Sequence, residues 1–351
     1  MSTRQAARIG ARRHAHRLLT GKQILQLRHA LRGRKLVVCF GGGVDSTAML
    51  VALKRAGIRP DVITFADTRA EKRLTYRHIR RMQRVLAAWG FPPITVVSHR
   101  TLEKTGYTDL EGECLQNETL PALAFGLHTC SQKWKASPQN QYIQGVSSGP
   151  NARPPHEIWI AAQASGERVV KLIGYDAGPA DVRRSNRLEL HDSDFDLFYP
   201  LQILGWKRQD CVRVIVSVLG PDLLPIKSAC FYCPASKVWE LYWLAAHEPE
   251  LFERALVIER NALTGHHSRY DDLRFGDSWD NLVRDAPSFP SSATSVGLGR
   301  SFAWCQWALV NGVVDHKFRV KRNRLAHFAA AADELMRADN AFDNRSCGIA
   351  A

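Results

Sequence analysis

The 351-residue sequence predicts an α/β fold in which a doubly wound, mostly parallel sheet is followed by a mainly helical C-terminal part. Two observations lead to this fold class. Short apolar strand patterns alternate with helix patterns through the first half of the chain, as in a parallel α/β sheet. In addition, the first predicted strand runs directly into three glycines and then into an Ala/Leu-rich segment, which is typical of a strand, a tight loop and a helix start.

The predicted elements follow one another in a regular order. Each strand is a short apolar run, and the four runs are residues 35–40, 61–66, 94–97 and 169–175. Helices are expected at 45–55, where Gly57 ends the first, and at 71–89, where Gly90 ends the second. Residues 145–157 are rich in Gly, Ser and Pro and read as a loop. Beyond residue 206 the pattern is helical, with a loop at 285–300 and a last helix near 325–338.

The composition limits the classes of protein that fit. An apolar content of 45% is ordinary for a globular chain, and no run approaches 18 apolar residues, so we expect no membrane span. Eight cysteines are too sparse for a disulfide scaffold in a chain of this length. Because the N-terminus has no apolar segment of the secretory kind, we expect a cytoplasmic protein with reduced thiols.

Most of the net charge of +14 lies at the N-terminus. Residues 1–35 hold ten Lys/Arg and no Asp or Glu, which leaves +4 on the rest of the chain. The first half of this basic arm carries five arginines, namely Arg4, Arg8, Arg12, Arg13 and Arg17. Such an arm would attract nucleic acid by releasing its counterions, but a solvated tail or an organelle transit peptide has the same composition. The sequence leaves these three interpretations open.

The glycine-rich turn reads Gly41-Gly42-Gly43-Val44-Asp45-Ser46-Thr47, directly after Phe40. Glycines let a backbone approach a ligand closely, and the first N–H groups of a helix have no partner within it. Together they form a site suited to phosphate, with hydroxyls of Ser46 and Thr47 as further donors and with Asp45 or Ser46 as a helix cap. The spacing is neither the dinucleotide pattern GxGxxG nor a Walker A loop. A plain glycine turn is the alternative.

This turn resembles the SGGxDS loop of the PP-loop ATP pyrophosphatases, an adenine nucleotide α-hydrolase-like superfamily. The match covers Gly42, Gly43, Asp45 and Ser46, and Gly41 stands where the family usually has serine. The resemblance implies that residues 40–47 bind the pyrophosphate part of ATP, with Mg²⁺ held by Asp45 directly or through water. It implies catalytic roles for Asp45 and Ser46. For Asp45, helix capping alone is the alternative.

Ligands of a doubly wound sheet bind beyond the carboxyl ends of its strands. We therefore expect the loop to converge with Asp67-Thr68 after the second strand and with Gly174-Tyr175-Asp176 after the fourth, which makes Asp67, Thr68 and Gly174 candidate nucleotide contacts. The segment 65–71 looks like the D-T-G-x-E segment of the phosphoadenosine phosphosulfate reductases, a branch of the same superfamily, with Arg69 in place of glycine. Helix capping is the alternative role of Asp67 and Glu71.

Further segments resemble reductase-like members of that branch, so that the resemblance covers roughly residues 35–305: 117–121, 130–135, 174–176, 183–184, 199–201, 227–234 and 297–301. Four basic residues in them are suited to a substrate's phosphate or sulfate, namely Lys133, Lys135, Arg183 and Arg184. Of these we predict catalytic roles for Lys133 and Arg183, and a solvated basic face is the alternative. Trp134 is predicted to pack rather than to stack on a base.

Cys230 and Cys233 form a CxxC motif, which serves either as a redox pair or as half of a metal site. The resemblance adds Cys130. Three cysteines could hold a [4Fe–4S] cluster, or a Zn²⁺ ion closed by Cys114, His128 or another residue, or they could remain free thiols. The sequence leaves these three alternatives open.

From these residues we predict three parts: the basic arm 1–34, a PP-loop nucleotide-binding domain 35–205 and a helical region 206–351 that carries the CxxC motif. The predicted reaction is cleavage of ATP between its α- and β-phosphates, adenylation of a substrate, and transfer of sulfur or nitrogen. One alternative is a sulfonucleotide reductase that would use Cys347, although the residues around it do not match the family's tail. The other is a nucleotide-binding module without turnover that serves a nucleic-acid modification or defence complex. The acceptor and the oligomeric state are not predicted.

Overall fold

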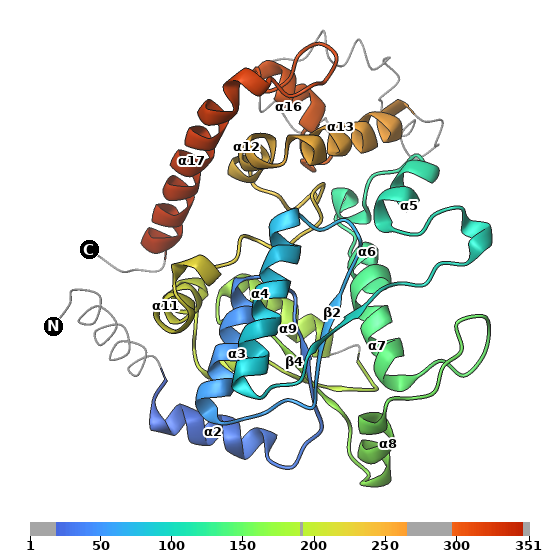
Figure 1. The fold of residues 1–351 in the computed structure, drawn as a ribbon, viewed down its shortest axis with the longest axis vertical. Helices are drawn as coiled ribbons and strands as arrows, with labels where there is room; N and C mark the ends of the chain where they lie inside the picture. The colour runs from blue at the N-terminus through green and yellow to red at the C-terminus, as the bar shows by residue number, and fades with distance from the viewer. Residues whose placement is uncertain (1–18, 190–191, 265–296, 347–351) are drawn as a thin grey trace, which may run out of the picture. The chain divides into compact units, whose positions relative to one another are not determined.

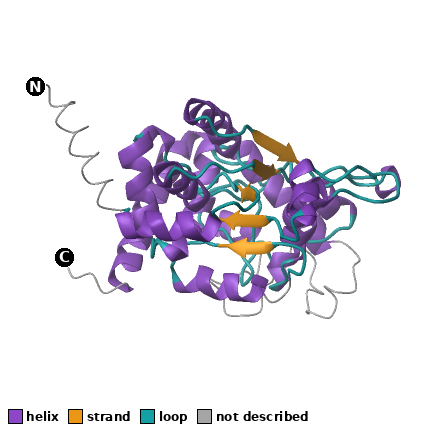
Figure 2. Cartoon of the chain, turned by 90° about the horizontal axis from the view of Figure 1, so that it is seen from below, coloured by secondary structure: helices purple, strands orange, loops and turns teal. Residues whose placement is uncertain are grey.

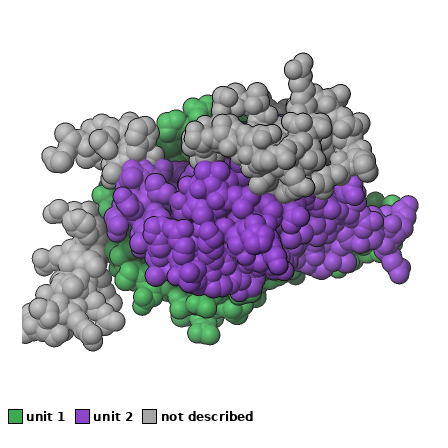
Figure 3. Space-filling view, turned by 90° about the horizontal axis from the view of Figure 1, so that it is seen from above, with its two compact units in different colours: residues 1–67, 73–100, 134–228 green, residues 68–72, 101–133, 229–351 purple. Residues whose placement is uncertain are grey.

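The computed structural model describes residues 19–189, 192–264 and 297–346 (Figure 1). The chain divides into two compact units, which Figure 3 distinguishes by colour. Unit 1 consists of residues 1–67, 73–100 and 134–228, and unit 2 of residues 68–72, 101–133 and 229–351. The five arginines of the predicted arm, Cys347 and most of the predicted loop 285–300 lie outside the described residues.

Unit 1 contains a five-stranded sheet in the order β3-β2-β1-β4-β5, with every neighbouring pair parallel. The strands are β1 (Leu36–Cys39), β2 (Val62–Ala66), β3 (Ile94–Val97), β4 (Val170–Ile173) and β5 (Asp196–Phe198). Strand β1 is central, since Val38 pairs with Ile63 on one side and with Leu172 on the other. The order reverses direction between β1 and β4, so these two strands flank the switch point of the sheet.

Helices cover both faces of this sheet. Successive strand residues point to opposite faces, so the apolar residues of β1 need a packing partner on each side. Leu36, Val38 and Phe40 share one core with four helices: α2 (Gly21–Leu31), α3 (Val44–Ala56), α4 (Arg73–Trp89) and α11 (Arg208–Leu219). Val37 belongs to a second core with α7 (Ser137–Gln144) and α8 (Glu157–Ala164). Figure 2 shows helices on both sides of the strands. The predicted doubly wound parallel sheet is thus confirmed.

The N-terminal part of unit 1 adds a helix that the sequence analysis did not predict. Helix α2 begins after Thr20, whose side chain accepts from the Gln23 amide while the Gln23 side chain accepts from the Thr20 amide. Leu27 and Leu31 are buried in the core of the sheet face. The second half of the predicted arm therefore packs as part of unit 1.

Unit 2 is helical in the part of the chain that the structure describes. Its helices of seven or more residues are α5 (Leu110–Gln116), α12 (Val238–His247), α13 (Pro249–Thr264), α16 (Trp304–Val310) and α17 (Leu325–Ser346). Aromatic side chains fill its interior, with Phe252, Trp304, Trp307 and Phe328 all nearly inaccessible to solvent. The predicted last helix is present as α17 and is longer than expected. Among the described helices, none combines the length and the apolar character that crossing a bilayer requires.

Candidate functional site

The glycine turn leads from β1 into the first turn of α3. Gly42 has φ +70°, which a glycine adopts without strain, and Gly43 is the N-cap residue and makes no side-chain cap. The Ser46 hydroxyl donates to the Gly43 carbonyl at 3.2 Å, so neither Asp45 nor Ser46 caps the helix as the sequence suggested. The amides of residues 44–46 find no acceptor among the described residues. This geometry leaves them available to an anion.

Two other segments of the chain, the end of β4 and residue Ser228, lie close to the turn. A Cβ on Gly174 would lie 2.7 Å from the backbone N and Cα of Ser46, so the end of β4 touches the start of α3. A Cβ on Gly43 would lie 2.8 Å from the Ser228 hydroxyl. At Gly41, in contrast, the nearest atom to such a Cβ is 3.8 Å away, so a side chain fits there. The structure thus brings Gly174 to the loop, as the sheet topology predicted.

Side chains on the buried side of α4 contact the glycine turn and the start of α3. Thr75 Cγ2 would lie 3.4 Å from a Cβ on Gly42, and Ile79 lies beside it. His78 Nε2 is 2.9 Å from the Thr47 hydroxyl, in a buried pair. Burial, and secondarily the positive charge of Arg81, lowers the pKa of His78 to about 4. The sequence analysis did not identify His78. Its position on the apolar side of the predicted helix 71–89 could have indicated that it is buried.

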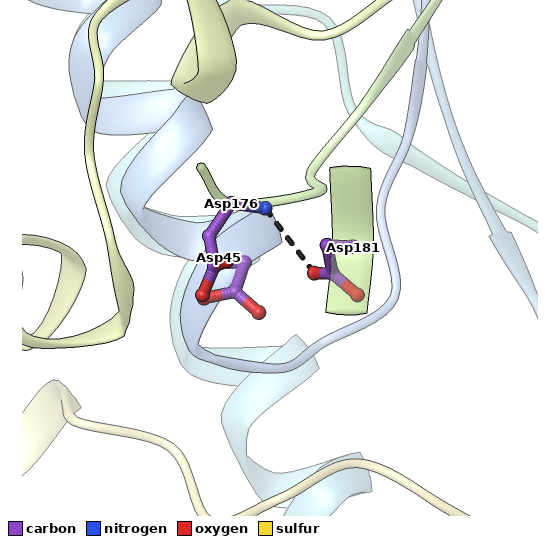
Figure 4. Close-up of side chains that lie close together, drawn as sticks. All are labelled: Asp45, Asp176 and Asp181. Atoms are coloured by element: carbon purple, nitrogen blue, oxygen red, sulfur yellow. Dashed lines mark hydrogen bonds between the residues drawn. The ribbon is translucent and has the colours of Figure 1, made fainter. Parts of the chain in front are cut away.

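Three carboxylates from three elements gather beside the turn (Figure 4). One oxygen each of Asp45, Asp176 and Asp181 lies within 4.8 Å of the others. Asp45 comes from α3, Asp176 from the turn after β4, and Asp181 from α9 (Pro179–Glu189). Backbone amides orient the last two: Gly178 N donates to Asp176 Oδ1 at 2.7 Å, and Asp176 N donates to Asp181 Oδ2 at 3.2 Å. Carboxylate oxygens so arranged are the ligands that Mg²⁺ prefers.

The electrostatics of Asp45 fit a cation at this place. Its Oδ2 pairs with Arg208 Nη1 at 2.9 Å, whereas its buried Oδ1 makes no hydrogen bond in the described part of the chain. Burial raises the pKa of Asp45 to about 7 against the lowering effect of Arg208, and burial also raises the pKa of Asp176. Sequence reasoning named Asp176 only as part of a strand end and did not name Asp181.

The end of β2 carries the other predicted nucleotide contacts. The Tyr76 hydroxyl donates to Asp67 Oδ1 at 2.7 Å. Thr68 belongs to unit 2, and its hydroxyl lies 3.3 Å from Cys230 Sγ. Asp67 is thus held by α4, and Thr68 is held beside the CxxC motif. Their roles as nucleotide contacts stay predictions.

The basic candidates have separate surroundings. Arg183 is exposed on α9, while its neighbour Arg184 donates to Asp181 at 3.0 Å. Lys133 belongs to unit 2, where it pairs with Glu113 and donates to the Tyr107 hydroxyl at 3.1 Å. Trp134 is 1% exposed and packs edge-on against His99, so it packs, as predicted, rather than offering a stacking surface.

The cysteines of the predicted metal site all lie in unit 2. Cys233 N donates to the Cys230 carbonyl at 3.0 Å, which closes the CxxC turn, and Cys230 forms an isolated β-bridge with Glu71. Burial raises the pKa of Cys114, and the negative charge of Glu113, followed by Cys230 and Cys130, acts in the same direction. In the described residues the sulfurs of Cys130, Cys230 and Cys233 do not all lie within 4.8 Å of one another. Cys114 is thus within electrostatic range of both Cys230 and Cys130, and thiolates are the ligands that thiophilic metals prefer.

Comparisons with known proteins give structural neighbours only. No protein-family model matches the sequence, and the search of curated proteins finds no match. Phosphoadenylyl-sulfate (PAPS) reductase from Candida auris, solved as a phosphate complex, has a TM-score of 0.35 and 14% identity over 58% of this chain and 81% of its own. The U34-tRNA thiolase NcsA from Methanococcus maripaludis, solved with its [4Fe–4S] cluster, has a TM-score of 0.34 and 11% identity over 87% of this chain and 76% of its own.

Proposed function

We propose that this chain is an enzyme that binds ATP on the turn of residues 40–47 and cleaves it between the α- and β-phosphates. The observation that carries the proposal is the meeting of three features: a glycine turn with open amides, the end of β4 pressed against it, and the carboxylates of Asp45, Asp176 and Asp181 beside it. Open amides at a helix start suit the departing pyrophosphate, and carboxylates beside them suit the metal that accompanies ATP.

The proposed reaction has two displacements. A substrate oxygen attacks the α-phosphorus, and the bond from that phosphorus to the bridging oxygen of the β-phosphate breaks, so that pyrophosphate leaves. A sulfur or nitrogen nucleophile then attacks the activated substrate carbon, and AMP leaves with the substrate oxygen. Catalysis comes from positioning and from neutralised charge, as at other phosphate-transfer sites.

The candidate residues divide these tasks. The amides of residues 44–46 and the Ser46 hydroxyl would hold the pyrophosphate oxygens, while His78 keeps the Thr47 hydroxyl in place. Asp45, Asp176 and Asp181 would hold Mg²⁺, which neutralises phosphate charge when it is bound. Asp67, Thr68 and Gly174 are the proposed adenosine contacts, and Lys133 and Arg183 are the proposed cations for a substrate phosphate or sulfate.

The cysteines of unit 2 complete the proposal. Cys130, Cys230 and Cys233 would hold a [4Fe–4S] cluster, and the donor set fits because thiolates are its usual ligands. With only these three cysteines as ligands, the fourth iron would be left open to a sulfur atom for transfer. Cys114 is buried within electrostatic range of Cys230 and Cys130, and it would close the site only if the cysteines held Zn²⁺ instead.

The test is formation of AMP and pyrophosphate from ATP and Mg²⁺ in single-turnover assays, in which water replaces the substrate oxygen as the nucleophile at the α-phosphorus. Asp45→Asn is the variant. The account expects at least a hundredfold slower cleavage in the variant, because a metal ligand is lost. Asp222→Asn, at an exposed aspartate, is the matched control and should cleave at the wild-type rate. Equal rates in wild type and Asp45→Asn would contradict the proposal. Thiol-dependent release of sulfite from a sulfonucleotide would instead identify a reductase.

A further inference from the structure

Helix α4 carries an arginine on almost every turn of its exposed side. Arg73, Arg77, Arg80, Arg81 and Arg84 are all exposed, and the helix contains no acidic residue. At 3.6 residues per turn these five positions fall within an arc of about 100°. The opposite side holds the buried residues, which are Thr75, His78, Ile79, Met82 and Leu86. The helix therefore divides into one basic face and one packed face.

Four arginines of this face, Arg77, Arg80, Arg81 and Arg84, have no carboxylate partner among the described residues. Exposed arginines elsewhere form ion pairs, such as Arg213 with Asp210 at 2.6 Å and Arg168 with Asp196 at 3.7 Å. No described carboxylate lies within 4.0 Å of Arg77, Arg80, Arg81 or Arg84. We call these four residues the α4 arginine face. Arg81 donates to the backbone carbonyl of Asp222, and that bond neutralises no charge.

Two more basic side chains lie at the C-terminal end of α4. Lys54 Nζ donates to the Trp89 carbonyl at 2.9 Å, and Arg59 Nε donates to the Gly90 carbonyl at 2.8 Å. Both side chains are exposed, and their charges lie at the C-terminal end of α4, where the helix dipole favours cations. Two further cations thus lie at the C-terminal end of the helix.

We propose that the α4 arginine face binds the phosphodiester backbone of a nucleic acid. Arg77 and Arg84 are about 10 Å apart along the helix axis, which covers about three successive phosphates of one duplex strand at 3.4 Å each. Arginine suits phosphate because its planar guanidinium can donate two parallel hydrogen bonds. An anionic membrane fits less well, because the apolar side chains of α4 are buried in the core and offer nothing to insert.

This inference rests on the proposed function and extends it. The nucleic acid bound on α4 would carry the acceptor group of the proposed reaction. The packed face of the same helix supports the glycine turn through Thr75 and His78. A nucleic acid held on α4 would therefore be bound by the element that supports the nucleotide site. Binding needs no ATP, so its failure and a failure of the proposed reaction can be told apart.

The test is fluorescence anisotropy of the full chain with a labelled DNA duplex and a labelled RNA hairpin of equal length, from about 50 to about 200 mM KCl. The triple variant Arg77→Gln/Arg80→Gln/Arg84→Gln should lower the slope of log K against log salt by about 2 to 3. It should also weaken binding about a hundredfold at the lowest salt. Whichever probe binds more tightly identifies the kind of nucleic acid.

A matched control removes the same charge elsewhere in unit 1. Arg168→Gln/Arg187→Gln/Arg213→Gln, at three other exposed arginines, should leave the salt slope within about one unit of wild type. Circular dichroism and melting temperatures verify that both triple variants fold. Equal losses in the two variants, an unchanged slope in the α4 variant, or tighter binding to phosphatidylserine vesicles than to either nucleic acid would overturn the proposal.

Discussion

Gly174 limits the shape of the proposed nucleotide site. A Cβ there would lie 2.7 Å from the backbone N and Cα of Ser46, and backbone atoms cannot move aside as the end of a side chain can. Gly174→Ala should therefore displace the start of α3 and weaken ATP binding at least tenfold. Titration calorimetry with ATP and Mg²⁺ measures the affinity.

Gly41 supplies the matched comparison, since a Cβ there has no neighbour nearer than 3.8 Å. Gly41→Ser should retain ATP binding, and the added hydroxyl can donate to a phosphate oxygen as the serine of the resembling loop would. If Gly41→Ser lost as much affinity as Gly174→Ala, the steric account of the loop would be wrong.

His78 makes the stability of unit 1 depend on pH. The pKa of His78 is about 4 in the folded chain, against about 6.5 when it is exposed, so the unfolded chain binds the proton first as pH falls. The free energy of unfolding should be level above about pH 6.5 and should fall by up to roughly 3 kcal/mol towards pH 4. Urea denaturation of wild type and His78→Gln across this range measures the difference.

The variant should have the shallower pH dependence, because it has no imidazole to protonate. His29→Gln, at an exposed histidine of α2, is the control and should follow the wild-type curve. Identical curves for wild type and His78→Gln would show that His78 is protonated equally in both states.

At the scale of elements, Glu259 of α13 binds the first turn of α16 and the segment before it. Its carboxylate is fully buried and accepts from the amides of Leu298, Trp304 and Cys305 at 2.7, 2.8 and 2.6 Å. In Glu259→Gln the side-chain NH₂ group would face backbone N–H donors in place of a carboxylate oxygen that accepts from them. This should destabilise unit 2 by about 2–4 kcal/mol. Chemical denaturation measures the loss.

Glu250→Gln is the control. The Glu250 side chain is 55% exposed, and its carboxylate forms a surface ion pair with Arg322 at 3.6 Å. An exposed pair of this kind contributes about 1 kcal/mol or less, so the control should stay near wild type. A loss of stability in Glu259→Gln no larger than in the control would contradict this role of Glu259.

The elements that the sequence predicted are those whose patterns are local. Strands β1 to β4 are apolar runs next to glycine or proline, and α3 and α4 end at Gly57 and Gly90 as expected. Strand β5 has only three residues, which follow a polar stretch, so no run marked it. Helix α2 was not predicted because its basic composition was interpreted as an arm. The i, i+4 spacing of Leu27 and Leu31, which indicates a buried helix face, was not used.

At the scale of the whole chain, the site combines residues that are far apart in the sequence. The glycine turn was visible as a motif, and the sheet order correctly placed Gly174 against it. The meeting of Asp45 with Asp176 and Asp181 depends on the turn after β4 and on the first turn of α9, which no local pattern specified. The support of Thr47 by His78 likewise depends on how α4 packs.

The cysteines of unit 2 lead to a prediction about the purified protein. Isolated without oxygen, it should show visible charge-transfer absorbance and about four irons per chain. Cys230→Ser should lose the iron, whereas Cys211→Ala, at a cysteine of unit 1, should keep it. A colourless protein with one zinc per chain would make the cysteines structural and would redirect the chemistry to adenylation without a cluster.

The most direct test of the central claim is calorimetric titration of the full chain with ATP, with and without Mg²⁺, in wild type and Asp45→Asn. If the glycine turn and the three carboxylates form a nucleotide site, wild type binds one ATP per chain, Mg²⁺ strengthens binding at least tenfold, and Asp45→Asn loses the effect of Mg²⁺. No binding of ATP by wild type, or an equal effect of Mg²⁺ in both proteins, would contradict the account.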